Sequence, residues 1–461
     1  MRQPLDVLRR PPVLAAAAGA LGAALYATLL LERASRLLPR AYDQAFFEQV
    51  VWNLGHGGGF RSGFAEGNFL GLHFSPLLLL PAAAEVAWPD ARLLSLVEAL
   101  GLGASAPAGF LLLRELLPAG RPAAWLAAAL SIPIPFWAEQ QAAALAEFHP
   151  EVLAVPAVML ATWAGLRGRL PAMFGFGLLA IAAKEDQAYA VALAGLVVFV
   201  RGPRPRAGLV LGLSAMLWGF LTVVVVMPLI RSGGANQLSG YYTWLAHPSP
   251  AEVVAALTSR QAWMVAGGLL ASCAGLPLLR PVWLLAALPP LLVDLLSSHD
   301  PQQHLGLHYG LPLVFPVVVA TGLGARRVLD AGIGLPAAAL AVPAIVVAIL
   351  LSPLLNLLGG NPHGVPEAGG RARLMACTSR LPARAAVAAD DSAATPLAAR
   401  PLLRLISDAQ PADWVVVDRI GYQPRYIDPA RRAEVLAGLE PAGRHLVCDD
   451  GRFQLWGPVS G

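Results

Sequence analysis

The stretch AGLVLGLSAMLWGFLTVVVVMPLI, residues 207–230, decides the fold because it contains no charged side chain. It is longer than the roughly 20 apolar residues that cross a bilayer as a helix. Pro12–Leu31 and Leu335–Leu351 are uncharged in the same way. Of the whole chain, 56% is hydrophobic and 13% charged, whereas about a quarter of the residues in soluble domains are charged. The sequence therefore excludes a soluble globular protein and predicts an all-α polytopic membrane protein.

Apolar runs separated by arginines predict about eleven transmembrane helices. A cytoplasmic N-terminus places every short basic loop inside, as the positive-inside rule requires. The exceptions are five arginines in a long first outer loop, residues 32–92, and Arg231 and Arg260 at the ends of another outer loop. We therefore expect a transmembrane domain over residues 1–352 in the bacterial cytoplasmic membrane. The expected spans are residues 12–31, 93–113, 122–137, 151–166, 170–183, 187–200, 207–230, 262–279, 281–297, 311–325 and 332–352.

The apolar run Phe74–Trp88 would reverse this arrangement if it crossed the membrane. It is short, begins with Ser75-Pro76 and contains Glu85. We therefore predict an amphipathic helix that lies in the outer interface.

The composition changes after residue 352, where charged residues become frequent. An odd number of spans places residues 353–461 outside, as a small α/β domain. We expect strands at 385–389 and 414–418, a helix at 429–439, and a hairpin formed by 445–448 and 453–456. Cys377 and Cys448 both lie in this exported domain, where disulfides persist. The sequence predicts a bond between them.

The first candidate site follows the first span, at Ala41–Asn53. On a helix, Asp43, Phe47 and Val50 share one face, and Glu48 lies on another. Of Asp43 and Glu48, one would therefore point toward a cavity, and the other would face solvent or a basic partner. An interfacial helix with solvated acids is the alternative. The glycine-rich run from 55 to 60 favours function, because such a run is costly unless the backbone turns tightly or approaches something.

Three further clusters carry polar groups. Residues 67–76 form a loop that delivers His73 to the interfacial helix, where histidine can serve a site or cap the helix. His149 lies between two carboxylates, Glu147 and Glu151, a composition that suits proton transfer or simply a helix N-terminus.

The fourth cluster, Lys184-Glu185-Asp186, places three charges between two apolar runs. Charges at the edge of the hydrocarbon region cost free energy unless they are paired or face a water-filled cavity. The alternative is that this segment is the tip of a helical hairpin in water. Lys184 is the one lysine of the chain. A compact ammonium of this kind suits a phosphate.

Other features are weaker. Asp294 lies within a span and is suspect as an intramembrane acid, although it could reach the outer end. His304 and His308 have i,i+4 spacing without a third ligand. We assign no metal site and no cofactor, although a divalent metal stays open. Nothing indicates nucleic acid.

The four clusters resemble a bacterial family of multispan membrane proteins known as a domain of unknown function. The resemblance covers residues 41–325 and, more loosely, the C-terminal domain. That family in turn looks like a distant branch of the C-type glycosyltransferase superfamily, whose multispan enzymes take a sugar from a polyprenyl-phosphate lipid on the outer face. The resemblance implies a catalytic acid in the first outer loop, a place that Asp43 matches, although the acidic pair of better-known branches is missing.

The sequence thus predicts an inverting glycosyltransferase. Asp43 and Glu48 are the catalytic candidates, and Lys184 with His73 binds the donor phosphate. Glu147, His149, Glu151, Glu185 and Asp186 support the site. The expected partners are a polyprenyl-phosphate sugar and membrane lipids, with the acceptor left open. A transporter or lipid flippase is one alternative, although transporters favour charges near the midplane. A non-catalytic scaffold is another.

Overall fold

The computed structural model describes residues 10–231, 240–334, 336–353, 367–408, 412–422 and 427–458. The chain divides into two compact units. Unit 1 comprises Met1–Tyr26, Leu72–Leu77 and Glu98–Leu355. Unit 2 comprises Ala27–Gly71, Leu78–Val97 and Asn356–Gly461. The boundary that we expect at residue 352 stays a prediction.

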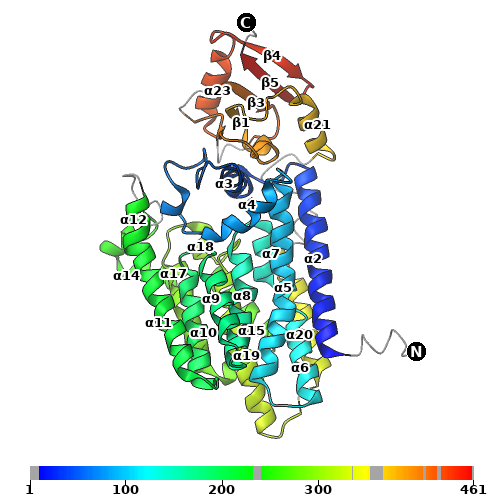
Figure 1. Cartoon of the computed structure of the whole chain (residues 1–461), viewed down its shortest axis with the longest axis vertical. Coiled ribbons are helices and arrows are strands. Elements are labelled where there is room, and N and C mark those ends of the chain that lie inside the picture. Colours follow the sequence, from blue (N-terminus) through cyan, green and yellow to red (C-terminus); the bar gives the residue numbers. More distant parts are fainter. Residues whose placement is uncertain are drawn as a thin grey trace, which may run out of the picture. The chain divides into compact units, whose positions relative to one another are not determined.

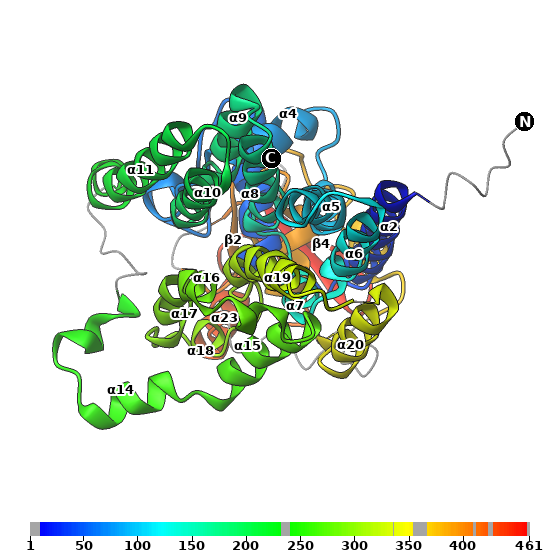
Figure 2. The same cartoon turned by 90° about the horizontal axis from the view of Figure 1, so that it is seen from below.

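Unit 1 is a helical bundle (Figure 1). Its helices α8, α9, α10 and α11 lie side by side, and α19 packs between α8 and α15 (Figure 2). Two helices, α2 (Pro11–Ser35) and α5 (Arg92–Leu116), contribute to both units. The others are α6 (Arg121–Ser131), α7 (Ala138–Leu145), α8 (Glu151–Leu166), α9 (Leu170–Ile181), α10 (Gln187–Arg201), α11 (Pro205–Leu221), α12 (Met227–Ile230), α14 (Pro250–Leu257), α15 (Arg260–Ser272), α16 (Pro281–Leu284), α17 (Leu288–Leu295), α18 (Asp300–Gln303), α19 (Val314–Asp330) and α20 (Ala337–Leu350).

Every expected span coincides with a helix or a broken helix, but the count of eleven spans is not confirmed. By length and composition, 5 helices of the described residues can cross a membrane: Pro11–Ser35, Arg92–Leu116, Pro205–Ile230, Pro250–Ser272 and Leu311–Asp330. Prolines explain why two of the expected spans are not continuous helices, because proline lacks the N–H that continues a helix. The span expected at 122–137 ends as a helix at Ser131, before Pro133 and Pro135, and the span expected at 281–297 is broken before Pro289.

Glycines set the contact between α10 and α11. A Cβ atom on Gly195 of α10 would lie 2.6 Å from the carbonyl oxygen of Gly208 on α11. Gly208 and Gly212 are four residues apart and face α10 together. Small residues at this spacing let two helix backbones approach closely, which is how helices associate in lipid.

The N-terminal part of unit 2 contains the first candidate segment. Residues Ala41–Ala45 form a π-helical turn, η1, and α3 (Phe46–Gly55) follows. Gly57 and Gly59 have φ of +79° and +72°, and a Cβ on Gly55 would lie 2.9 Å from the Ala82 carbonyl oxygen. The expected tight turn and close approach of this glycine run are therefore confirmed.

The run expected to lie in the interface is a short helix. A 3-10 turn, Pro76–Leu78, leads into α4 (Leu79–Glu85). This element is too short to cross a bilayer. Its place in the outer interface stays a prediction.

The C-terminal part of unit 2 is an α/β domain with a five-stranded sheet in the order β2-β1-β3-β5-β4. β1 is parallel to β2 and β3, whereas β5 is antiparallel to β3 and β4. Val387, Val416 and Leu455 are fully buried in its core. The elements are α21 (Gly370–Cys377), β1 (Val387–Ala389), α22 (Asp391–Ala394), β2 (Leu403–Leu405), β3 (Trp414–Asp418), α23 (Pro429–Gly438), β4 (Arg444–Asp449) and β5 (Phe453–Pro458).

The predictions for this domain are confirmed at β1, β3, α23 and the β4–β5 hairpin. The short strand β2 was not expected. Cys377 and Cys448 form the predicted disulfide, with their Cα atoms 5.6 Å apart. It joins α21 to β4, so it links the beginning of the domain to its last hairpin.

Candidate active site

A cavity of about 480 Å³ lies within unit 1. One side of it is polar and comes from the beginnings of α8 and α10, the end of α17, and the residues around α18. The other side is apolar and comes mainly from the end of α11, the π-helical turn after it (η5, Thr222–Val226) and α17. Its polar lining residues are Glu151, Lys184, Glu185, Asp186, Gln187, Tyr189, Asp294, Gln302, His308 and Tyr309.

Lys184 is held between carboxylates at the polar side. Its Nζ atom lies 2.6 Å from Glu151 Oε1 and 3.6 Å from Asp186 Oδ2. Burial opposes the charge of this lysine, but Glu151 first, and then Asp186, outweigh burial and hold the pKa of Lys184 well above its usual value. Lys184 is therefore a permanent cation at the cavity wall. An ammonium has three donors, so the two carboxylates leave it capacity for a ligand.

The position of Lys184 follows from the helix boundaries. α9 ends at Ile181 and α10 begins at Gln187, so Lys184 lies in a short connection directly before a helix N-terminus. The first turn of α10 lines the cavity through Gln187, Ala188 and Tyr189. Amide groups of a first helical turn lack intrahelical partners and favour an anion.

Glu185 joins this connection to the segment before α4. His73 Nδ1 lies 3.3 Å from Glu185 Oε1, and the Phe74 backbone N–H donates to Glu185 Oε2 over 2.9 Å. Burial opposes ionisation of Glu185, but the hydrogen bond and charge of His73 lower its pKa to about 2. Glu185 is therefore an anion that holds residues 73–74 at the site.

A row of rings leads to Glu151. His149 and His308 stack with their ring centroids 3.6 Å apart, and Tyr309 packs against His308 at 4.2 Å. His308 Nε2 lies 4.0 Å from Glu151 Oε1. Burial, followed by the neighbouring His149, lowers the pKa of His308 well below its usual value. His308 is therefore neutral and does not compensate the acids around it.

The backbone beside these rings is strained. Glu147, Leu305 and Leu307 have φ of 70°, 54° and 54°, the left-handed region that side chains other than glycine rarely adopt. The Glu147 carbonyl oxygen lies 3.0 Å from His149 Nδ1. Strain of this kind concentrates at functional sites, where the surrounding structure holds it in place.

Several buried polar atoms at the cavity have no hydrogen-bond partner in the described part of the chain. They are Glu151 Oε2, Tyr189 Oη, Asp294 Oδ2 and His308 Nδ1. The other oxygen of Asp294 accepts a hydrogen bond of 3.0 Å from Gln302. A buried polar atom without a partner costs free energy, so these atoms indicate a cavity that takes a polar ligand.

The opposite wall is suited to a hydrocarbon chain. Met216, Phe220, Val223 and Val224 line the cavity and are each about half exposed. Together with the polar side, this wall makes the cavity amphipathic. It can hold a molecule with a polar head and an apolar tail.

Asp43 and Glu48 belong to unit 2, apart from the unit that contains Lys184. Asp43 lies half-buried in η1. Glu48 is fully buried, so the solvent-facing acid that we allowed for on this helix is not Glu48. Burial and then the neighbouring Glu85 raise the pKa of Glu48 well above its usual value. The catalytic roles of Asp43 and Glu48 stay predictions.

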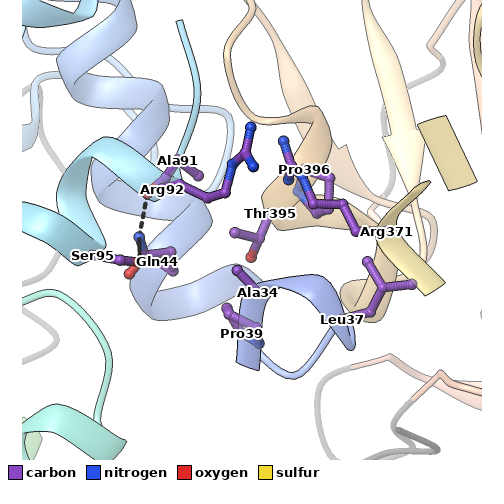
Figure 3. A pocket seen from close by; sticks show the side chains of 10 residues that line it. All are labelled: Ala34, Leu37, Pro39, Gln44, Ala91, Arg92, Ser95, Arg371, Thr395 and Pro396. Carbon is purple, nitrogen blue, oxygen red and sulfur yellow. Dashed lines mark hydrogen bonds between the residues drawn. The ribbon is translucent and has the colours of Figure 1, made fainter. Parts of the chain in front are cut away.

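Unit 2 also contains a small cavity (Figure 3), of about 10 Å³. Gln44 donates to the Ala91 carbonyl oxygen over 2.6 Å at its edge. The guanidinium groups of Arg92 and Arg371 point toward one another there, and each lies 2.7 Å from Asp90 Oδ2. This volume holds about one water. It is therefore a packing feature and not a substrate site.

The structure brings together most of the predicted polar clusters of unit 1: His73, Glu147, His149, Glu151, Lys184, Glu185 and Asp186. Tyr189 and Gln302 were missed. Tyr189 follows Asp186 by about one helical turn, a usable signal, whereas nothing in the sequence marks Gln302. His304 pairs with Asp300 at 3.2 Å instead of joining His308. Among the described residues, no three His, Cys, Asp or Glu side chains are grouped to hold a metal ion.

The fold and the site define a multi-pass helical membrane protein with a lysine-containing amphipathic cavity. The chain belongs to the family described as Predicted membrane protein (DUF2079), whose model matches residues 33–423. The resemblance drawn from the sequence motifs is thereby confirmed at the level of the family.

No curated protein matches the chain. Among solved structures, ArnT from Cupriavidus metallidurans bound to undecaprenyl phosphate is 13% identical, with a TM-score of 0.48, and the alignment covers 95% of this chain and 97% of that one. The same protein in the apo state is 11% identical, with a TM-score of 0.47 and coverage of 90% and 93%. A likeness at this level carries no argument about activity.

Proposed function

We propose that this chain is an integral-membrane glycosyltransferase. It moves a sugar from a polyprenyl-phosphate donor to an acceptor on the outer face of the bacterial cytoplasmic membrane. The observation that carries the proposal is the amphipathic cavity of unit 1, with Lys184 and unpartnered buried polar atoms on one side and the apolar wall of α11 on the other.

Each part of the donor has a counterpart in this cavity. The polyprenyl chain lies along Met216 and Phe220 of α11 and Val223 of the π-helical turn that follows it. The phosphate lies at Lys184 and the first turn of α10, because both favour an anion. The sugar hydroxyl groups donate to carboxylate oxygens such as Glu151 Oε2 and Asp294 Oδ2, which have no partner among the described residues.

The reaction needs a base and a charge for the leaving group. The acceptor hydroxyl oxygen attacks C1 of the sugar while its proton passes to a carboxylate, and the bond from C1 to the phosphate oxygen breaks. The pair of electrons leaves with the polyprenyl phosphate, whose charge Lys184 stabilises. A single base of this kind gives inversion. Asp43 is the proposed base, from the resemblance, and Asp294 is the candidate within the cavity.

The arginine distribution supports a cytoplasmic N-terminus and an outer C-terminal domain. This arrangement would place the polar cavity on the outer side, where a lipid-linked sugar meets an acceptor of the cell envelope. His73 serves the phosphate site indirectly, by holding Glu185 beside Lys184.

The test uses the full-length protein in nanodiscs with undecaprenyl phosphate as the probe. Native mass spectrometry should detect saturable binding that the Lys184→Met/Glu151→Gln double variant loses. In parallel, a deletion strain should accumulate a lipid-linked sugar and lose a surface glycan.

In a transfer assay with the purified protein in detergent solution, a flippase would bind the lipid but transfer no sugar. A scaffold would not bind the lipid. Either result would overturn the proposal. The Asp330→Asn variant is the control, because Asp330 pairs with Arg326 on the surface of α19, and it should bind the probe as the unchanged protein does.

A further inference from the structure

The charge around the cavity is unbalanced. Three carboxylates, Glu151, Glu185 and Asp186, surround one permanent cation, Lys184, and a fourth acid, Asp294, lines the same space. His73 Nδ1 lies 3.3 Å from Glu185 Oε1. His308 is buried and neutral. Carboxyl groups therefore outnumber the permanent cation on the polar side of the cavity before any ligand enters.

The donor phosphate increases this imbalance. It brings negative charge to Lys184, whose ammonium already contacts Glu151 and Asp186. Among the described residues that line the cavity, a second negative group on the same ligand would find no permanent cation other than Lys184. Like charges in a partly dry site repel strongly, because water no longer screens them.

We propose that the cavity selects donors whose sugar carries no acidic group, so that neutral sugars bind and uronic acids are rejected. This inference rests on the proposed function and adds the class of sugar to it. The acids act in two ways at once. They accept hydrogen bonds from sugar hydroxyl groups, and they exclude a ligand carboxylate by repulsion, which is how a site gains specificity against a close analogue.

Asp186 is the residue at which this selection can be adjusted. Its side chain is half exposed and lies 3.6 Å from Lys184 Nζ, and its Oδ1 accepts a hydrogen bond of 2.8 Å from Gln187. Asp186→Asn removes one negative charge and keeps the shape of the side chain. The variant should therefore strengthen the binding of an acidic donor more than the binding of a neutral one. Any effect on the phosphate is common to both donors.

The experiment compares two probes on one lipid, polyprenyl-phosphate glucose and polyprenyl-phosphate glucuronic acid. Binding to the full-length protein in nanodiscs is measured by native mass spectrometry, with both probes competing. We expect the neutral probe to bind about tenfold more tightly or better, as expected for one unscreened like charge. Asp186→Asn should reduce this ratio several-fold, and the charge-matched Asp330→Asn control should leave it unchanged.

Different results would contradict the donor selection and the proposed function. Equal binding of the probes, or tighter binding of the glucuronic acid lipid, overturns the selection while leaving the glycosyltransferase proposal intact. A ratio that Asp186→Asn and Asp330→Asn change alike also overturns it, because the cavity acids would then not be the cause. Absence of binding by both probes overturns the proposed function and this inference with it.

Discussion

Lys184 Nζ lies 2.6 Å from Glu151 Oε1, although the two residues are 33 positions apart in the chain. Glu151 begins α8, and Lys184 lies three residues before the first residue of α10, Gln187. This buried ion pair fixes the first turns of both helices around the cavity. It also presents one cation beside a carboxylate whose second oxygen, Oε2, has no partner among the described residues.

Lys184→Met should destabilise the protein as well as abolish lipid binding. The substitution leaves Glu151 buried without its cation, which costs about 3–5 kcal/mol. The double variant Lys184→Met/Glu151→Gln should recover most of the lost stability and still fail to bind undecaprenyl phosphate. Thermal unfolding and native mass spectrometry of both variants separate the two effects. A single variant as stable as the unchanged protein would show that the pair contributes little.

Substitution of the base should abolish transfer without affecting the fold. Asp43→Asn keeps the shape of the side chain and removes its basicity, so the rate should fall by about 10²–10⁴-fold. Asp294→Asn is the matched comparison, measured in the same transfer assay. Full activity of the Asp43 variant together with loss in the Asp294 variant would move the role of base to Asp294.

Stability should fall as the pH rises through neutrality. Burial raises the pKa of Glu85 to about 7, above the value of about 4.3 for an exposed glutamate. The folded state thus binds this proton more tightly, so the stabilisation is complete below the unfolded pKa and is lost as the pH rises through about 7.

The apparent melting temperature of the purified protein between about pH 5 and 8 measures this effect. Glu85→Gln should flatten the profile, since an amide does not titrate. Glu48→Gln is the companion variant and should be measured in the same way, because Glu48 and Glu85 interact. An unchanged slope in both variants would assign the pH dependence to other groups.

Loss of the Cys377–Cys448 bond should lower the stability of the C-terminal domain. The bond closes a loop over a sequence separation of 71 residues. In the chain-entropy model a loop of this size contributes roughly 4 kcal/mol. Alkylation followed by mass spectrometry should find these two cysteines protected, and Cys377→Ser/Cys448→Ser should unfold at lower denaturant. Free thiols at both positions in protein from the membrane would contradict this expectation.

The C-terminal domain should lie outside the cytoplasm. A reporter fused after Gly360 should be active only if it is of the kind that works after export, because the arginine distribution places an odd number of spans before it. An active cytoplasmic reporter at the same position would reverse the orientation. It would also require the segment 74–88 to cross the membrane.

Local sequence patterns were sufficient to predict the C-terminal hairpin, the two buried strands and the tight turn of the glycine run before residue 60. Each of these depends on neighbours in sequence, such as a turn between two alternating strands or a backbone that needs positive φ. The limits of α6 and α17 were less accurate, because prolines within apolar runs end helices without changing the hydropathy of the run. Strand β2 is only three residues long, and its pairing with β1 cannot be read from so short a segment.

The sequence by itself determined that the chain is a membrane protein, which segments are apolar, and that Lys184 is an unusual charge. Composition and periodicity carry this information locally. Only the tertiary structure decided that Lys184 pairs with Glu151, that His149 stacks on His308, and that Asp294 faces the same cavity. Charges and rings far apart in the chain meet through helix packing, and packing in lipid depends on close small-residue contacts that hydropathy does not encode.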